Sequence, residues 1–131
     1  MFGLLFTVIL FSSCGKSTQT PISIFNWSLN NIPQEQATAV AYINSIEAVS
    51  PTKHIEISLH TVNGFPVGIY TMDATGGNII GIWDSSTPSL YSVSGTLNIS
   101  YSTTEKVNGT FDVMLSDGSN MKGSFSNILF D

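Results

Sequence analysis

From residue 22 onward, apolar and polar residues tend to alternate along the chain, and residues 53–62 show the pattern most clearly. The apolar positions in this segment are Ile55, Ile57 and Leu59, and the polar positions are His54, Glu56, Ser58 and His60. Because successive side chains of a β-strand point to opposite faces, this alternation gives one apolar and one polar face. It predicts an antiparallel strand with one face buried and the other in water.

Similar segments, rich in β-branched and aromatic residues, recur along the chain between clusters of Gly, Pro, Asn and Ser. They predict strands at residues 22–29, 37–44, 53–62, 68–72, 78–83, 89–101, 106–116 and 119–130. Between residues 34 and 50 the chain could suit a helix through its Ala and Glu residues, but Val40, Tyr42 and Ile43 favour strand. The interpretation is a strand at 37–44, with a short helical turn after it as an option. Asp117-Gly118 predicts a hairpin with a two-residue turn.

Three glycines, Gly95, Gly109 and Gly123, are spaced fourteen residues apart, each within a short apolar pattern. That spacing suits one long strand plus a tight turn, so the repeat predicts three adjacent strands in meander order. Glycine inside a strand usually marks a bulge, a bend or a close backbone approach. Apolar residues two positions to either side of each glycine favour a curled sheet over the alternative that the glycines merely begin the strands.

These patterns together predict an all-β fold. About eight antiparallel strands in meander order would curl into an open barrel or a two-sheet sandwich. Residues 22–131 have a usual length for one domain, so a single β domain is expected.

The start of the chain has a different character, because an apolar run at residues 2–11 directly precedes Ser12-Ser13-Cys14. Such a run is too short to cross a bilayer, which takes roughly 20 residues, but it suits the core of a signal peptide. Small residues followed by a cysteine are typical of the cleavage box of bacterial lipoproteins. The pattern predicts a lipoprotein signal peptide at residues 1–13 and lipidation of Cys14.

A polar segment at residues 14–21, with a helix-breaking proline, would then serve as a tether between the lipid and the domain. Cys14 is the only cysteine of the chain, so a disulfide partner is missing, which favours lipidation. The alternative is a buried apolar strand with an incidental cysteine. The lipoprotein interpretation places the protein in the cell envelope, with the outer membrane as the expected location.

Charged residues are sparse, with four Lys+Arg, nine Asp+Glu and a net charge of −5 at pH 7. The chain has no arginine and its lysines are scattered, which argues against a phosphate-binding surface and a nucleic-acid partner. The negative charge also disfavours electrostatic binding to anionic lipids. Membrane contact is therefore expected through the lipid on Cys14, and no cofactor is expected.

Four motifs occur in order: Gly68-Ile69-Tyr70-Thr71, YSVSGTLNIS at residues 91–100, VNGTFDV at residues 107–113 and Gly123-Ser124-Phe125. The set resembles an uncharacterised family of small Bacteroidota lipoproteins with GTY, SGTLTI, ISGTFSF and GxF elements behind a lipidated cysteine. The resemblance covers about residues 22–130, with Ile69 in place of the more usual threonine. The resemblance implies a fold built of β-strands and a location in the cell envelope. The family is a domain of unknown function, so the resemblance implies no catalytic residue.

His54, Glu56 and His60 lie on one face of the predicted strand at residues 53–62, where imidazole and carboxylate groups suit a metal or a general base. However, His54 and His60 are six residues apart, which is about 20 Å in an extended chain. They cannot share a metal without other elements, so a strand face in solvent is the preferred interpretation.

Other candidate chemistry is weaker still. The acidic candidates for a calcium site are Asp73, Asp84, Asp112 and Asp117, and they form no recognisable calcium-binding loop. The serines lack a G-x-S-x-G nucleophile motif. No catalytic residue is identified, and the protein is not expected to be an enzyme.

Aromatic residues could instead form a stacking surface for sugars, because rings with a polar group suit wet sites. The candidates are Trp27, Tyr70, Trp83, Tyr91 and Tyr101. The alternative for both tryptophans is ordinary core packing, which is favoured because Ile80 and Ile82 precede Trp83 in an apolar strand.

Two functions remain open at this point. The first is a non-catalytic binding or structural module of the envelope that contacts an envelope protein or a glycan. The second is a lipocalin-like carrier of a small apolar ligand inside the curled sheet. A carrier needs an apolar cavity of some hundreds of Å³, whereas a binding module needs a filled core and an exposed aromatic or polar patch.

Overall fold

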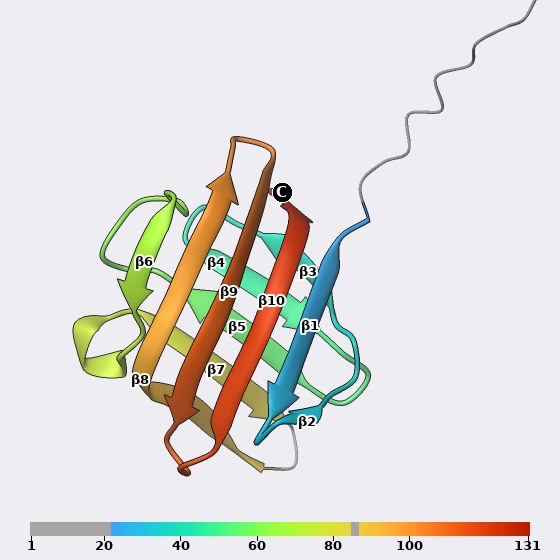
Figure 1. Cartoon of the computed structure of the whole chain (residues 1–131), viewed down its shortest axis with the longest axis vertical. Coiled ribbons are helices and arrows are strands. Elements are labelled where there is room, and N and C mark those ends of the chain that lie inside the picture. The colour runs from blue at the N-terminus through green and yellow to red at the C-terminus, as the bar shows by residue number, and fades with distance from the viewer. Residues whose placement is uncertain (1–21, 85–86) are drawn as a thin grey trace, which may run out of the picture.

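The computed structural model describes residues 22–84 and 87–131, and nearly all of its elements are β-strands (Figure 1). The strands are β1 (Ile24–Leu29), β2 (Ile32–Pro33), β3 (Thr38–Ala41), β4 (Ser45–Val49), β5 (His54–Ser58), β6 (Gly68–Thr71), β7 (Ile79–Asp84), β8 (Thr87–Ser102), β9 (Lys106–Leu115) and β10 (Asn120–Leu129). A single 3₁₀ turn in these residues, η1 (Ala74–Gly76), precedes β7. The predicted all-β class is confirmed.

The strands pair antiparallel in the order β2-β1-β10-β9-β8-β7-β5-β4-β3, and β6 pairs with β8 beside this path. From β3 to β10 each strand therefore lies next to its neighbour in the sequence, except at β6, and β1 returns to pair with β10. The predicted meander order is confirmed, including the three adjacent strands β8, β9 and β10 that carry the repeated glycines.

The sheet curls into two layers (Figure 1). A front layer holds β6, β8, β9, β10 and β1, and a rear layer holds β3, β4, β5 and β7, which cross behind it. Two backbone hydrogen bonds join the ends of the curl. The Ala37 N–H donates to the Phe25 carbonyl at 3.2 Å, and the Asp131 N–H donates to the Ala41 carbonyl at 2.9 Å. They bring β3 back beside β1 and the end of β10.

Strand β8 is long enough to belong to both layers. Its first half pairs with β7 and its second half with β9 and β6. The register shifts between Ser92 and Ser94, and the buried Ser92 hydroxyl accepts a hydrogen bond from the Ile80 N–H at 3.0 Å. Directly after this bulge, Gly95 has φ +119°, and a Cβ there would lie 2.3 Å from the Asp112 carbonyl oxygen. Gly95 therefore allows the change of layer, as expected for a glycine that supports a curled sheet.

Gly109 and Gly123 have a different role. Gly109 pairs with Phe125, and Gly123 pairs with Phe111. A Cβ at Gly109 would lie 2.6 Å from Cζ of Phe125, and a Cβ at Gly123 would lie 2.3 Å from Cζ of Phe111. Each glycine thus leaves room for the ring of its cross-strand partner, so packing rather than bending explains these two positions.

Apolar side chains fill the space between the layers. Phe25 stacks against Phe125 with ring centroids 6.0 Å apart, and both contact the same continuous core. The largest side chains with less than 2% exposure are Phe25, Phe65, Ile46, Ile55, Ile57, Leu59, Met72, Ile80, Leu97, Ile99, Leu115 and Met121. If these side chains lined a cavity large enough for a ligand, they would have accessible surface inside that cavity, and they have almost none. The described interior is therefore packed in the manner of an ordinary protein core.

The helical turn considered as an option after the strand at 37–44 does not form. The chain reverses there, because the Tyr42 N–H donates to the Ser45 carbonyl at 2.7 Å, and residues Ser45–Val49 form strand β4. In β4 the apolar Ile46 and Ala48 are buried, and both neighbouring strands bond to it. This pairing on both sides outweighs the helix preference of Ala and Glu.

The hairpin predicted at Asp117-Gly118 joins β9 to β10, but its loop has three residues rather than two. The Leu115 N–H donates to the Ser119 carbonyl at 2.8 Å, and the Gly118 N–H donates to the Leu115 carbonyl at 2.9 Å. Only Gly118, at φ +86°, has a left-handed backbone within this loop. The geometry is that of a turn followed by a glycine bulge.

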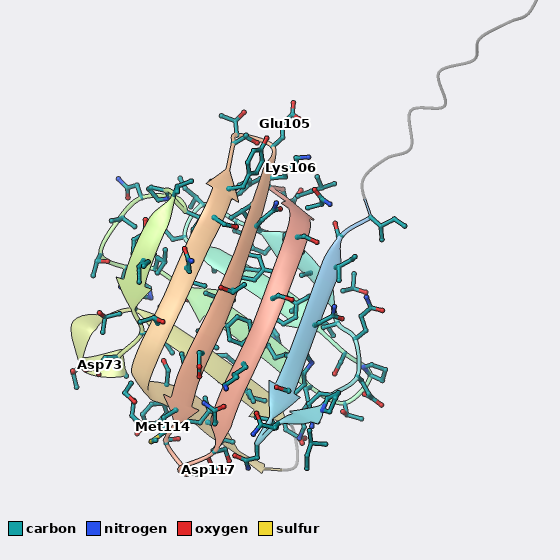
Figure 2. The ribbon with its side chains drawn as sticks, in the orientation of Figure 1. Asp73, Glu105, Lys106, Met114 and Asp117 are labelled. Atoms are coloured by element: carbon teal, nitrogen blue, oxygen red, sulfur yellow. The ribbon has the colours of Figure 1, made fainter. Side chains whose placement is uncertain are left out.

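Asp117 gives this loop a pH dependence. Its carboxylate accepts a hydrogen bond from the Ser119 N–H at 2.9 Å, and this bond and one from the Ser119 side chain hold the pKa of Asp117 below its usual range. A lowered pKa stabilises the fold above the unfolded value, about 3.9, and the gain is lost as the pH falls through the folded value. Figure 2 places Asp117 at the end of the domain opposite Glu105 and Lys106.

We expect Asp117→Asn to lower the free energy of unfolding at pH 7, and we expect the difference from the parent to shrink as the pH falls through the lowered pKa of Asp117 and its carboxylate becomes protonated. The difference at pH 7 should stay below about 1 kcal/mol, because solvent screens an exposed carboxylate. Urea unfolding of both proteins between pH 2 and pH 7 measures it. A difference that grows toward low pH would contradict the assignment.

Candidate binding face on the rear layer

The outward side of the rear layer carries a row of residues across four strands. Glu47 on β4 pairs with Glu56 on β5, Glu56 pairs with Gly81 on β7, and Gly81 pairs with Tyr91 on β8. In the neighbouring row, His54 pairs with Trp83. We call these six residues the Trp83 face. The residues between them along each strand point to the core, as the two-residue period requires.

The indole ring of Trp83 lies over Gly81. A Cβ at Gly81 would be 2.6 Å from Cη2 of Trp83 and 2.8 Å from its Cζ3, so a side chain at that position would displace the ring. Trp83 nevertheless remains 37% exposed, and Tyr91, across from Gly81, is 47% exposed. Gly81 thus lets a large aromatic ring lie along the sheet while part of it stays open to solvent.

His54 lies between the indole and a carboxylate. Its ring centroid is 6.0 Å from the Trp83 ring, and its Nε2 is 3.9 Å from Oε2 of Glu47. Although 44% of the His54 side chain is accessible, Nε2 itself is buried and makes no hydrogen bond among the described residues. The accessible part of the imidazole, rather than the covered Nε2, is therefore a candidate contact for a ligand.

Two carboxylates complete the face. Glu47 lies directly across from Glu56, and like charges in opposite positions of a sheet are destabilising. Glu56 accepts a hydrogen bond from the hydroxyl of Ser58, which fixes one of its oxygens. The side chain of Glu47 is 40% exposed. The face therefore presents carboxylate acceptors next to an aromatic surface.

The structure separates the predicted stacking residues. Trp27 is only 4% exposed, and its indole N–H donates to the Glu35 carbonyl at 2.9 Å, so its ring belongs to the core. Tyr70 is on β6 in the other layer, with its hydroxyl donating to the Pro66 carbonyl at 2.6 Å. Tyr101 lies near the other end of β8, where the Lys106 ammonium is 5.7 Å from its ring centroid. Trp83 and Tyr91 are the two that share one face.

His54 and Glu56 share a strand face as predicted, but His60 lies beyond the end of β5, where its backbone N–H donates to Asn78 Oδ1 at 3.1 Å. The four aspartates considered for calcium have separate local partners. Asp73 caps η1, Asp84 pairs with Lys53, Asp112 contacts Asn120 and Lys122, and Asp117 contacts Ser119. Within residues 22–84 and 87–131, no three His, Cys, Asp or Glu side chains are grouped for a metal ion.

Glu47 and Gly81 were not identified from the sequence. Glu47 was missed because β4 was not predicted, although Glu47 alternates with the apolar Ile46 and Ala48. Gly81 was missed because its role depends on the rotamer of Trp83, two residues away on the same face. A glycine two positions before an aromatic residue in a strand is the available signal.

Comparisons of the chain with protein-family models, curated proteins and solved structures found no match. Cys14, the predicted lipidation site, lies outside the described residues. None of the helical structure described here is long and apolar enough to span a membrane.

Proposed function

We propose that the protein is a non-catalytic glycan-binding module of the cell envelope that binds through the Trp83 face. The observation that carries this proposal is the exposed indole of Trp83, which lies along the sheet over Gly81 beside a second exposed ring, Tyr91. Aromatic residues that are partly exposed in this way suit ligands with an apolar face and a polar edge. A sugar ring has this shape, with C–H groups on its faces and hydroxyls around its rim.

The polar residues of the face suit the hydroxyls of a sugar. Carboxylates accept hydrogen bonds, and Glu47 and Glu56 lie on two strands next to the indole. A sugar hydroxyl between them would also relieve their mutual repulsion. The accessible part of the His54 side chain offers a further contact. From β4 to β8 the face spans three strand spacings, roughly 14 Å, which suits a short oligosaccharide.

Binding accounts for this face better than catalysis does. The side chains of Glu47 and His54 are 40% and 44% accessible, whereas catalytic carboxylates act best in sites that exclude water. The alternative of a carrier has less support, because the residues that would line an interior cavity are almost completely buried.

Attachment to the envelope is part of the same proposal. It rests on the signal-peptide pattern that ends at Cys14, and the outer membrane is the proposed location. Membership of the Bacteroidota lipoprotein family is likewise a proposal, supported by the order of the four strand motifs. An anchored module with a glycan-binding face would hold its membrane against an envelope polysaccharide.

We expect Trp83→Ala to weaken oligosaccharide binding at least about tenfold, because exposed tryptophans at the centre of a binding surface carry much of the affinity. The probes are short oligomers of glucose, mannose and N-acetylglucosamine and soluble peptidoglycan fragments, titrated by calorimetry. Ligand should also change the fluorescence of the parent but not of Trp83→Phe, which retains only the core residue Trp27. If none of these probes binds the parent protein, the glycan proposal is wrong.

Two tyrosines of β8 provide a matched control. Tyr91 and Tyr101 are 47% and 44% exposed, but only Tyr91 belongs to the Trp83 face. Tyr91→Ala should weaken binding about fivefold or more, and Tyr101→Ala should leave it unchanged. An equal loss in both variants would place the site elsewhere.

A further inference from the structure

A second site lies at the end of the domain where the hairpin between β8 and β9 turns, marked in Figure 2 by Glu105 and Lys106. A hollow of about 480 Å³ opens there, within the range of pockets that hold small molecules. Its ten lining residues come from four separate segments, which are residue 43, residues 63–66, residues 102–104 and residues 130–131. None of these residues belongs to the Trp83 face.

The hollow has an apolar floor. The rings of Phe65 and Phe130 pack with their centroids 6.4 Å apart, and Phe65 is only 2% exposed. Ile43, in the turn between β3 and β4, is 75% exposed, so its side chain has no cover within the protein. An aliphatic chain placed against Ile43 and the partly buried Phe130 would remove apolar surface from water on both partners.

Hydrogen bonds hold the walls of the hollow in place. The Gly64 N–H donates to Asn44 Oδ1 at 3.1 Å, and the Tyr70 hydroxyl donates to the Pro66 carbonyl at 2.6 Å. On the other side, the Phe130 N–H donates to the Glu105 carbonyl at 2.9 Å. Because the walls are fixed before binding, a ligand would lose little affinity to ordering the protein.

Polar residues at the rim of the hollow determine which head group a bound aliphatic chain can carry. Ser102 and Thr104 offer hydroxyls, and Asn63 offers an amide, whereas the Thr103 hydroxyl is bonded to the backbone of residues 105 and 106. Among the ten described lining residues, Asp131 carries the one formal charge. An anionic head group would be repelled by this carboxylate, whereas a hydroxyl can bond to it and to the neighbouring side chains.

We propose that this hollow binds an aliphatic chain with an uncharged, hydroxylated head group. Calorimetry of the full chain with hexanol, heptanol and octanol, each below its solubility limit, tests the proposal. Affinity should rise about fourfold for each added methylene that is buried. Octanoate should bind more weakly than octanol. In the spectrum of the isoleucine methyl groups, octanol should shift Ile43 and leave Ile22 unshifted.

Ile43→Ser and Ile22→Ser form a matched pair, since both isoleucines are about equally exposed, 75% and 76%, and Ile22 does not line the hollow. Ile43→Ser should lower octanol affinity roughly tenfold and Ile22→Ser should leave it unchanged. The proposal is wrong if octanol binding does not saturate, if octanoate binds as tightly as octanol, or if both variants lose the same affinity for octanol. The methyl shifts of the parent give an answer even if a variant does not fold.

Discussion

Gly95→Ala should cost about 3 kcal/mol or more of the free energy of unfolding. Two effects add at this position. Its φ of +119° is one that residues with a Cβ rarely adopt. An added Cβ would also lie 2.3 Å from the Asp112 carbonyl oxygen and 2.5 Å from the Val113 Cα, and backbone atoms cannot move aside cheaply. Since domains of this size are stable by only about 5–15 kcal/mol, the variant should be substantially destabilised. Urea unfolding followed by the fluorescence of the buried Trp27 measures the loss.

Other glycines separate the two effects. Gly118 has φ +86° but nothing within 4 Å of its virtual Cβ, so Gly118→Ala should cost only about 1 kcal/mol of backbone strain. Gly76 has neither a left-handed φ nor a neighbour within 4 Å, and Gly76→Ala should change stability by less than about 0.5 kcal/mol. A cost for Gly95→Ala no larger than that for Gly118→Ala would contradict the close contact between β8 and β9.

The glycine repeat explains why much of the fold could be predicted from the sequence. Gly109 and Gly123 lie in two neighbouring strands of a meander, so their spacing in the chain reflects one strand plus one turn. Local alternation and turn residues were sufficient for this region because its neighbours in space are also neighbours in sequence. The pairing of β1 with β10 joins the two ends of the domain. A pattern within one segment cannot predict it, because the two strands are far apart in the sequence.

Strand β4 shows the limit of local patterns. Its five residues, Ser45–Val49, contain Ala and Glu, and the tight turn at Ile43-Asn44 carries neither glycine nor proline. What makes it a strand is the pair of neighbours, β3 and β5, that bond to its two edges. Because Glu47 lies on β4, the carboxylate side of the candidate face could not be predicted either.

The two tryptophans show how the face itself could have been predicted better. Trp27 and Phe25 are two residues apart in β1, so their side chains point to the same face of the sheet, and both are buried. Trp83 follows Ile82 by one residue, so it must point away from the face that buries Ile80 and Ile82. The core interpretation holds for Trp27 but not for Trp83, which is 37% exposed. The alternation of side chains along a strand, rather than the apolar character of the neighbouring residues, decides which face a side chain occupies.

Cys14→Ala should abolish incorporation of a labelled fatty acid and release the protein from membranes into the soluble fraction. The reason is that each buried methylene of an acyl chain contributes about 0.8 kcal/mol to membrane binding, so several chains on one cysteine would hold the protein firmly. The sparse and mostly negative charge of the chain offers no comparable attraction to anionic lipids. Metabolic labelling of the full chain in a bacterial host, followed by membrane fractionation, measures both effects.

Ser13→Ala is the matched control for this experiment, because alanine keeps the residue before Cys14 small and leaves the thiol in place. Label and membrane association should both survive in this variant. The lipoprotein proposal is wrong if Cys14→Ala takes up the label or if the parent does not. Neither result bears on the glycan titrations, since these test the Trp83 face of the described domain. If Cys14→Ala loses the label and still binds oligosaccharide as the parent does, attachment and recognition reside in separate parts of the chain. The tether would then set where the protein is held, and the sheet would set what it binds.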